Sequence, residues 1–520
     1  MSQIALTEQE IERLQATVDH LSTNLTNLVE PEAKQVLTER ALYLRKLNEL
    51  QPCISILPVE TLSTIFQFVC SPLSHFSEHG FQEFSWHHPF DTDLSIASVL
   101  VLSAVSHRWR QVAISLPQLW QILRVLPRPT QYHPESWVNL LRLCIDRSSS
   151  SMDLLLDYQA ISHQQEALLP HPEDSYLTLD ELEWAVYINS PRTIKSLSLI
   201  GCSGMIWWLD LVKLLAQLTN LERLRLNWSG GGETEIEIGI PRFLVVGSRL
   251  TIVDLKHFPY GLALELMRHC PNLIHYRCYQ PSTPDHPEDG TQNHQYNDRN
   301  IFPCLEWLDW PAEFVPETLL FGSISTPALR GLKWRHILPH ATDEHLISRI
   351  DATFLQFVST TGNTLTELDL VPGTAGSDSS VRVQDLLTQS FNQLPNLRKL
   401  TLRGSRFQLS FLSSSLITPL MKHSSTIPSP SLQFLAFHLF SPPSCVGRRP
   451  KLTVATHVLD LLEQRWELGL VRHFQLALNF PYEWEDEVRD GFQKLVEQGL
   501  QLELLVETKP VDWLAKVPGL

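Results

Sequence analysis

The sequence predicts an α/β protein in which N-terminal helices precede a solenoid, with a parallel sheet on its concave side and helices outside. Three observations predict this fold class. Apolar residues recur at helical spacing over residues 7–50, and two amphipathic stretches follow between residues 54 and 120. From residue 194 to residue 437 the pattern Leu-x-x-Leu-x-Leu then recurs with substitutions, and such self-similarity is typical of repeat architectures.

Composition and charge limit the classes of partner. The 520 residues are 43% hydrophobic and 9% aromatic, as in a globular protein. Asp and Glu outnumber Lys and Arg by 57 to 41, so the chain lacks the cationic surface on which nucleic-acid binding depends. The eight cysteines form no Cys-x-x-Cys pair, and no signal peptide or membrane-length apolar run is recognisable. We therefore expect a soluble protein of the cytoplasm and/or nucleus that binds neither nucleic acid nor membrane.

Residues 1–51 are expected to form two helices. Thr7 and Glu10 have the spacing of a capping box, and Pro31 interrupts the helix that follows. Apolar residues in the first helix alternate at three- and four-residue steps, as in a heptad seam, at Ile11, Leu14, Val18, Leu21, Leu25 and Leu28. Three heptads are short for a free-standing coiled coil, so two interpretations stay open. Residues 8–29 form a homodimer or partner arm, or the two helices form an intramolecular hairpin.

Residues 52–124 are expected to contain short amphipathic helices. Pro58 suits the first turn of a helix, where no backbone N–H is needed, and Ser106 is a good N-cap. Apolar stripes follow at helical spacing, formed by Leu62, Ile65, Phe66 and Val69 and by Trp109, Val112 and Ala113. Helices of about 10 residues are marginal in water without tertiary packing, so another surface is expected to cover these stripes.

Three segments of this region, Leu57-Pro58-x-Glu60-x-Leu62-x-x-Ile65-Phe66, Val105-Ser106-x-Arg108-Trp109 and Leu116-Pro117-x-Leu119-Trp120, resemble an F-box of the fungal F-box-like type. The resemblance implies a three-helix fold that binds a Skp-family adaptor and, through it, a cullin. The adaptor-binding residues that it implies are Leu57, Pro58, Glu60, Leu62, Ile65, Phe66, Val105 and Trp109. The other interpretation is a helical hairpin that caps the next domain.

Residues 71–97 interrupt the motif. They are rich in His and aromatic residues but contain no recognisable pair of metal ligands, so we expect a surface loop.

From about residue 150 the chain is repetitive. Nine strand-like matches begin 23 to 36 residues apart, most of them after a helical stretch. They lie at Ile194–Leu199, Leu221–Leu226, Leu250–Leu255, Leu273–Cys278, Leu305–Trp310, Leu329–Trp334, Leu365–Leu370, Leu397–Leu402 and Leu432–Phe437. This array resembles an irregular leucine-rich repeat. We expect a linker helix over residues 125–149, the solenoid over 150–480 and a C-terminal cap over 481–520.

Alternation along each predicted strand identifies a row of side chains on the concave face, because successive side chains in a strand point to opposite faces. We expect this row to be exposed. Its members are Arg225, Asn227, Asp254, Lys256, Arg277, Asp309, Lys333, Arg335, Asp369, Thr401, Arg403 and His438. The candidate client-binding residues among them are Arg225, Asn227, Lys256, Asp309, Lys333, Arg335, Asp369 and Arg403. The row is slightly rich in cations and would suit an acidic or phosphorylated segment, but the favoured interpretation is the mixture of charges that any solvated sheet edge carries. Binding a protein on the concave face is nonetheless the usual role of such solenoids.

No catalytic motif is recognisable. The sequence has no phosphate-binding loop with its lysine, no dinucleotide fingerprint, no His-Glu-x-x-His and no Gly-x-Ser-x-Gly. His275 and Cys278 are close in sequence to His269 and Cys270, but on a strand they would face opposite sides. We expect no enzymatic activity, no catalytic residue, no metal and no cofactor.

The resemblance to an F-box followed by leucine-rich repeats implies a substrate-recognition adaptor subunit of a Skp–cullin–F-box ubiquitin ligase, whose repeat arc binds a client protein that the sequence does not identify. The alternative is a scaffold or interaction protein that uses its repeats and its N-terminal coiled coil without a link to ubiquitin.

Overall fold

A computed structural model describes most of the helices and strands of the chain. The described residues are 2–25, 30–50, 57–70, 96–125, 134–148, 152–157, 194–202, 214–215, 217–228, 249–258, 260–279, 300–312, 321–322, 324–336, 344–372, 380–405, 417–421, 427–440, 454–478, 485–506 and 509–510. The chain divides into two compact units, residues 1–199 and 200–520. This division falls inside the predicted solenoid. Most of the predicted loop 71–97 lies outside the described residues.

The first unit begins with a helical hairpin. Helices α1 (Ser2–Leu25) and α2 (Glu30–Leu50) pack against each other, and Leu14 and Val18 of the predicted seam are buried. Arg40 Nε of α2 donates a hydrogen bond to Ser22 Oγ of α1 at 2.9 Å. Pro31 lies in the first turn of α2, where its missing N–H has no cost. The seam is therefore used within the chain, and a homodimer through residues 8–29 stays a prediction.

Three α-helices and a 3₁₀ turn follow, and we call residues 57–70 and 96–120 the helical module. Its elements are α4 (Val59–Val69), α5 (Ile96–Val105), α6 (His107–Ser115) and η1 (Pro117–Trp120). Ser106 is the N-cap of α6, as predicted, and its hydroxyl accepts a hydrogen bond from Trp109 N at 3.1 Å. The Pro58 carbonyl accepts from Leu62 N at 3.1 Å in the first turn of α4.

The helical module has its own closed core. Leu62 and Phe66 are fully buried, and the ring of Phe66 meets that of Trp109 edge-on at a centroid distance of 5.0 Å. Trp120 Nε1 donates to the carbonyl of Ala113 at 2.8 Å. Arg108 Nη2 donates to the carbonyl of Leu57 at 2.6 Å and so joins the two halves of the module across the interruption in sequence.

The module is followed by the first strands of the chain. Strands β1 (Ile122–Val125) and β2 (Met152–Asp157) pair in parallel, and α7 (Pro134–Arg147), within the predicted linker helix, packs against β1 and η1. Strand β3 (Ile194–Cys202) spans the division between the two units.

The second unit is built on a parallel sheet. Its strands from β4 to β15 pair in chain order, each parallel to the next, and β16 closes the edge by antiparallel pairing with β15. They are β4 (Arg223–Trp228), β5 (Ile252–Lys256), β6 (His275–Tyr279), β8 (Trp307–Ala312), β10 (Gly331–His336), β11 (Glu367–Pro372), β12 (Lys399–Ser405), β13 (Phe434–Phe440), β14 (His473–Leu478), β15 (Gln501–Val506) and β16 (Lys509–Pro510). A separate parallel ladder joins β7 (Asn300–Ile301) and β9 (Ile324–Ser325). The predicted α/β class with a parallel sheet is confirmed.

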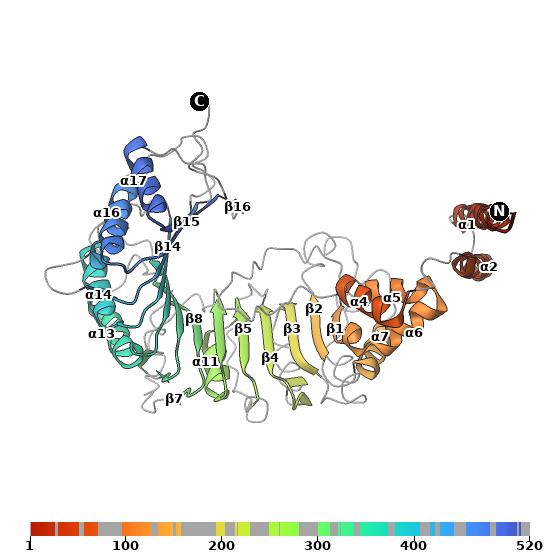
Figure 1. Cartoon of the computed structure of the whole chain (residues 1–520). Helices are drawn as coiled ribbons and strands as arrows, with labels where there is room; N and C mark the ends of the chain where they lie inside the picture. Colours follow the sequence, from red (N-terminus) through yellow and green to blue (C-terminus); the bar gives the residue numbers. More distant parts are fainter. Residues whose placement is uncertain are drawn as a thin grey trace, which may run out of the picture. The chain divides into compact units, whose positions relative to one another are not determined.

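Helices connect many of these strands. They are α11 (Tyr260–Arg268), α13 (Glu344–Thr361), α14 (Ser380–Asn392), α16 (Val454–Glu467) and α17 (Asp486–Glu497). In Figure 1, α13, α14 and α16 lie on one side of the strands that they connect. Leu and Trp side chains of the strands, such as Leu308 and Trp310, are fully buried. No helix of the described residues is both long and apolar enough to cross a membrane.

One backbone hydrogen-bond pattern recurs along the sheet. The carbonyl of Glu222, just before β4, accepts from the N–H groups of both Thr251 and Ile252, at 2.8 and 3.1 Å. The same double acceptance is found at the carbonyls of Thr251, Ile274, Glu306, Arg330, Thr366, Arg398 and Gln433. Each strand therefore begins at the same height as its neighbour, and residues at equal positions in successive strands lie side by side.

The connection between β12 and β13 differs from its neighbours. Its described part has only a 3₁₀ turn, η6 (Thr418–Leu420), instead of a long helix. Arg465 of α16 is buried there and donates hydrogen bonds to the carbonyls of Leu420, at 2.9 and 3.2 Å, and of Pro428, at 2.7 Å. Burial lowers the pKa of this guanidinium to about 10. Arg465 thus satisfies carbonyl groups that a regular helix would have paired internally.

Candidate interaction surfaces

Helices α4 and α5 carry apolar side chains that the helical module does not bury. Phe68 is 84% exposed and Val101 is 66% exposed. The other exposed apolar residues of these helices are Val59, Ile65, Val69 and Leu100. Helix α5 has an almost wholly apolar sequence, so only part of its surface can pack on α4 and α6.

The predicted adaptor-binding residues divide between this surface and the core. Leu62 and Phe66 are fully buried, so the prediction that they contact a partner is wrong. Their side chains are covered where α4 packs on α6. Pro58, Glu60 and Ile65 are exposed, whereas Leu57, Val105 and Trp109 are half-buried. The stripe predicted for α4 is also narrower than expected, because Val69 is exposed.

Sequence reasoning missed the most exposed apolar residues, Phe68 and Val101. Phe68 lies off the stripe that contains Leu62 and Phe66, and an apolar residue off a predicted helical stripe was the available signal.

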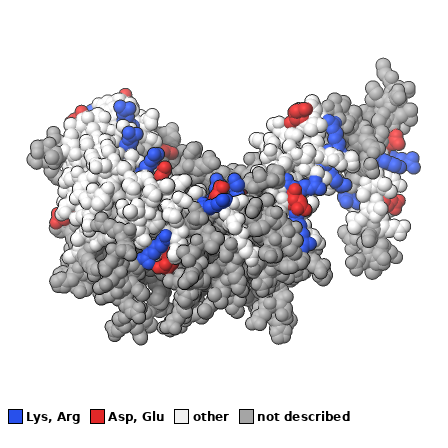
Figure 2. Space-filling view, turned by 90° about the horizontal axis from the view of Figure 1, so that it is seen from below, with Lys and Arg blue, Asp and Glu red and all other residues white. Residues whose placement is uncertain are grey.

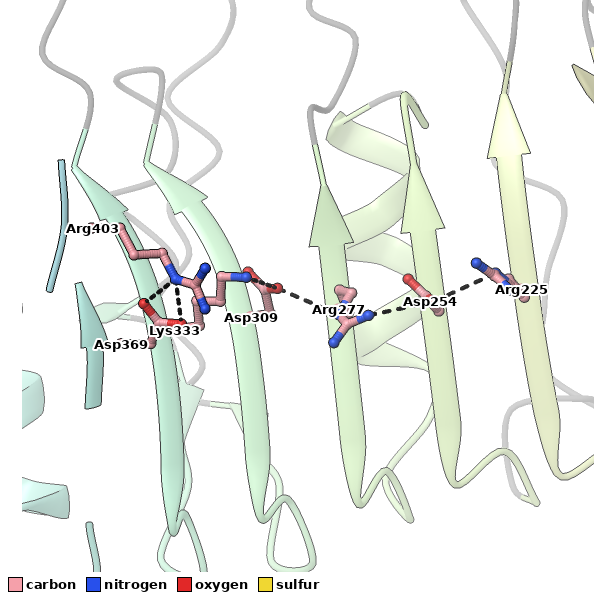
Figure 3. Close-up of polar contacts among 7 residues, drawn as sticks. All are labelled: Arg225, Asp254, Arg277, Asp309, Lys333, Asp369 and Arg403. Atoms are coloured by element: carbon pink, nitrogen blue, oxygen red, sulfur yellow. Dashed lines mark hydrogen bonds and ion pairs between the residues drawn. The ribbon is translucent and has the colours of Figure 1, made fainter. Parts of the chain in front are cut away.

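A row of alternating charges crosses the sheet of the second unit (Figure 3). We call it the charged row, and its members are Arg225, Asp254, Arg277, Asp309, Lys333, Asp369 and Arg403. The first six occupy equal positions on β4, β5, β6, β8, β10 and β11. Their signs alternate from strand to strand, so each cation has a carboxylate beside it. Arg403 lies two residues beyond the position on β12 that pairs with Asp369.

Ion pairs link the charged row from strand to strand. Asp254 Oδ2 lies 3.6 Å from Arg225 Nε and 3.9 Å from Arg277 Nη1. Asp309 Oδ2 lies 3.4 Å from Arg277 Nε and 3.6 Å from Lys333 Nζ. In a second group, Arg403 Nε donates to both carboxylate oxygens of Asp369 at 2.9 Å. Each carboxylate of the first group thus lies between two cations.

The prediction from the sequence that the longer concave-face row, from Arg225 to His438, is exposed is wrong for most of its members. Arg225 is 2% exposed and Asp309 is 1% exposed; Asn227, Lys256, Lys333, Thr401 and Arg403 are also buried, and Asp369 is half-buried. The side chain of Arg335 lies outside the described residues. In-register strands about 4.8 Å apart place long side chains against one another, so they shield each other from water. Burial lowers the pKa of Arg225 and of Lys256, and for Lys256 the neighbouring Arg225 adds to this effect.

A second row on the same face is more accessible. It consists of the first residue of each strand, and we call it the strand-start row. Its members are Arg223, Ile252, His275, Trp307, Gly331, Glu367, Lys399, Phe434, His473 and Gln501. They lie two residues before the charged-row positions and therefore point to the same side of the sheet. All except Gly331 are half-buried or exposed, and the Lys399 side chain is 46% exposed.

Two pairs of rings stand out in the strand-start row. His275 and Trp307 are stacked, with a centroid distance of 6.2 Å and an interplanar angle of 18°. Phe434 and His473 meet edge-on at 4.7 Å, and Lys399 Nζ lies 5.4 Å from the Phe434 ring centroid. Burial lowers the pKa of His275, although Glu306 opposes this shift, so the imidazole is neutral at pH 7. Alternation of apolar and polar residues could not reveal this row, because the rings occupy positions that the pattern assigns to solvent.

Several exposed charges lie beside a charge of opposite sign. On the face drawn in Figure 2, blue and red groups adjoin one another at several places. Lys399 pairs with Glu367 at 3.3 Å, and Arg330 with Glu306 at 3.9 Å. Within the described part of the chain, no group of three or more His, Cys, Asp or Glu residues is placed to hold a metal ion.

The predicted cluster around Cys270 is part of the fold. Cys270 and Cys278 are both buried, and burial raises the pKa of Cys270 to about 12, so its thiol stays protonated.

Comparison of the chain with protein-family models and with curated proteins gave no match. The functional interpretation therefore depends on the two surfaces just described, the exposed apolar side chains of the helical module and the accessible rings of the sheet.

Proposed function

We propose that the protein is the substrate-recognition adaptor subunit of a Skp–cullin–F-box ubiquitin ligase. The helical module would be the F-box that binds a Skp-family adaptor, and through it a cullin. The parallel sheet with its helices would be an irregular leucine-rich repeat that binds the client protein. Other subunits of the ligase would perform the transfer of ubiquitin.

The observation that carries this proposal is the apolar surface left over on the helical module. Four of the 11 residues of α4, namely Val59, Ile65, Phe68 and Val69, are exposed apolar side chains, although the module has closed its core around Leu62 and Phe66. Single exposed apolar residues are normal, but a concentration of large ones on a short element is typical of an interaction site. A helical hairpin that only capped the next domain would have no use for Phe68 in solvent.

The sheet supports the second half of the proposal. The recurring double acceptance at the carbonyls before the strands makes the strands structurally equivalent, as expected of a repeat array. The leucines of the repeated pattern, for example Leu224, Leu332 and Leu400, are buried in register. Solenoids of this kind usually present one face of the sheet to a protein partner.

Co-purification with a Skp-family adaptor tests the proposal. The full chain is co-expressed with the adaptor, and a stable complex is expected. Replacing Phe68 and Ile65 together by Asp places charges on the exposed surface of α4 and is expected to abolish the complex without unfolding the chain, because neither side chain is part of the core.

Ile301→Asp is the matched control, because Ile301 is a similarly exposed apolar residue on β7. This control variant should retain the adaptor. Absence of a complex with the wild-type chain, or a complex that survives the double substitution, would contradict the proposal.

The alternative is a scaffold without a link to ubiquitin. It is favoured by the helical hairpin, where Leu37 and Leu42 of α2 remain about half exposed although α1 and α2 pack on each other. Sedimentation of the full chain, with and without Leu37→Glu plus Leu42→Glu, tests self-association through this hairpin. The scaffold interpretation gains support if wild-type chain self-associates, the variant does not, and no adaptor is retained.

A further inference from the structure

We infer that the client is bound on the strand-start row as an extended, uncharged segment with two proline or aromatic anchors, and not on the charged row. This inference rests on the proposed function only in calling the partner a client. The binding surface itself is defined by the second unit.

The charged row is a poor surface for an acidic or phosphorylated partner. Asp254 and Asp309 already lie between two cations each, at 3.4 to 3.9 Å, and Asp369 accepts two hydrogen bonds from Arg403. An anionic partner would have to displace these carboxylates and reach cations that are themselves largely buried, such as Arg225. Separating a buried ion pair costs more than a new surface contact provides.

The first anchor is the His275–Trp307 pair. The indole of Trp307 lies over Gly331 on the next strand, and a Cβ at residue 331 would overlap its six-membered ring. On the other neighbouring strand, β6, the imidazole of His275 is stacked with the same indole. The indole is thus fixed between two strands while remaining partly accessible, and a rigid aromatic of this kind loses little entropy when a partner binds.

The second anchor is the Phe434–His473 pair on β13 and β14. It combines an aromatic ring with an imidazole at the same strand position as the first anchor. Lys399 on β12 contacts the Phe434 ring and pairs with Glu367 on β11. The cation and the carboxylate between the two anchors therefore neutralise each other, so they favour no charge in a partner that passes over them.

The spacing of the anchors determines the kind of segment that fits. From β8 to β13 there are four strand-to-strand steps, through β10, β11 and β12. At 4.7–4.9 Å per step this is about 19 Å, which an extended chain at about 3.3 Å per residue covers in about six residues. Proline and aromatic side chains bind well against exposed rings, because they bury large apolar surfaces with little conformational freedom to lose.

A peptide selection tests the inference without the adaptor. A phage-displayed library of random peptides of about 12 residues, long enough to span 19 Å, is selected on the full chain. Enriched peptides should carry two proline or aromatic residues about six positions apart and few acidic residues. Trp307→Ala and Phe434→Ala should each raise the Kd of a selected peptide about tenfold, whereas Trp307→Phe should retain most of the affinity.

Two further variants sharpen the result. Gly331→Ala should weaken the binding of the selected peptide, because the added Cβ displaces the Trp307 indole, although the substitution removes no atom that contacts the peptide. Phe68→Asp, in the helical module, should leave the peptide Kd unchanged, so failure of the adaptor complex and failure of this inference are distinguishable. Enrichment of acidic peptides, binding that both alanine variants retain, or no enrichment at all would overturn the inference.

Discussion

Phe68 on α4 is 84% exposed, whereas Arg225 on β4 is 2% exposed. An apolar side chain thus lies in water in one unit while a cation is buried in the other. The comparison shows that burial follows the available neighbours: Arg225 has a carboxylate at the same height on the next strand, and Phe68 has no further helix of the module to pack on.

The largest effect is expected from removing a shared carboxylate of the charged row. Asp309→Ala leaves Arg277 and Lys333 without the group that lies between them, and it should lower the free energy of unfolding by about 3–5 kcal/mol. The measurement is the urea midpoint of the full chain. Adding Lys333→Met to this variant should restore part of the loss, because one uncompensated cation is then removed.

The exposed ion pair of Arg330 with Glu306 provides the control for that experiment. Arg330→Ala should leave the urea midpoint unchanged, since surface pairs contribute little. Equal midpoints for wild type and Asp309→Ala would show that the charged row does not stabilise the sheet.

A smaller loss of stability is expected from replacing Arg465, which is a buried cation stabilised by carbonyl groups. Arg465→Met should cost about 1–3 kcal/mol, because the carbonyls of Leu420 and Pro428 lose their donors. Arg465→Lys should not restore stability, as a single ammonium group cannot reproduce the planar array of donors. Urea titration of both variants tests this, and full rescue by lysine would contradict the proposed role of the guanidinium geometry.

The strand-start row makes a modest pH-dependent contribution through His275. Burial lowers its pKa below the ordinary value of 6.5, so the folded state binds this proton less tightly than the unfolded state does. Stability should therefore be complete above pH 6.5 and fall as the pH drops below it toward the folded-state pKa. His275→Gln should flatten this slope in urea midpoints measured between about pH 7.5 and about pH 5. If wild type and His275→Gln show the same slope, His275 is not the source of this pH dependence.

The smallest effect on stability is expected at the surface of α4. Phe68→Ser should change the free energy of unfolding by no more than about 0.5 kcal/mol, because the ring has almost no contacts to lose. Phe66→Ala, two residues away in the core, should cost about 3–5 kcal/mol in the same assay. A large loss from Phe68→Ser would mean that its ring packs within the chain and would weaken the proposed adaptor surface.

Several features of the fold could be predicted because they depend on short stretches of sequence. Ser106 as N-cap needs only the N–H of Trp109 three residues later, and the repeated leucines need only the two-residue period of a strand. The helical hairpin was one of two open interpretations, because the apolar spacing of the first helix is the same whether the second helix belongs to the same chain or to another.

Which residues of the candidate surfaces are buried and which are exposed could not be predicted in the same way. Polarity alone suggested that Arg225 and Asp309 face water, and the resemblance to an F-box implied that Leu62 and Phe66 face a partner. Their burial depends instead on residues that pair with them across strands or pack on them from another helix. The accessible rings at Trp307 and Phe434 also required the strand register, which places each beside an imidazole on a neighbouring strand.

The sequence by itself determined the element types, the parallel α/β class and the positions of the buried leucines, since periodicity and capping act within a few residues. Only the tertiary structure decided which polar residues are buried and which apolar residues remain outside. The physical reason is that the free energy of burying a charge or exposing a ring depends on the partner atoms within a few ångströms, and in this protein many of those atoms belong to distant parts of the chain.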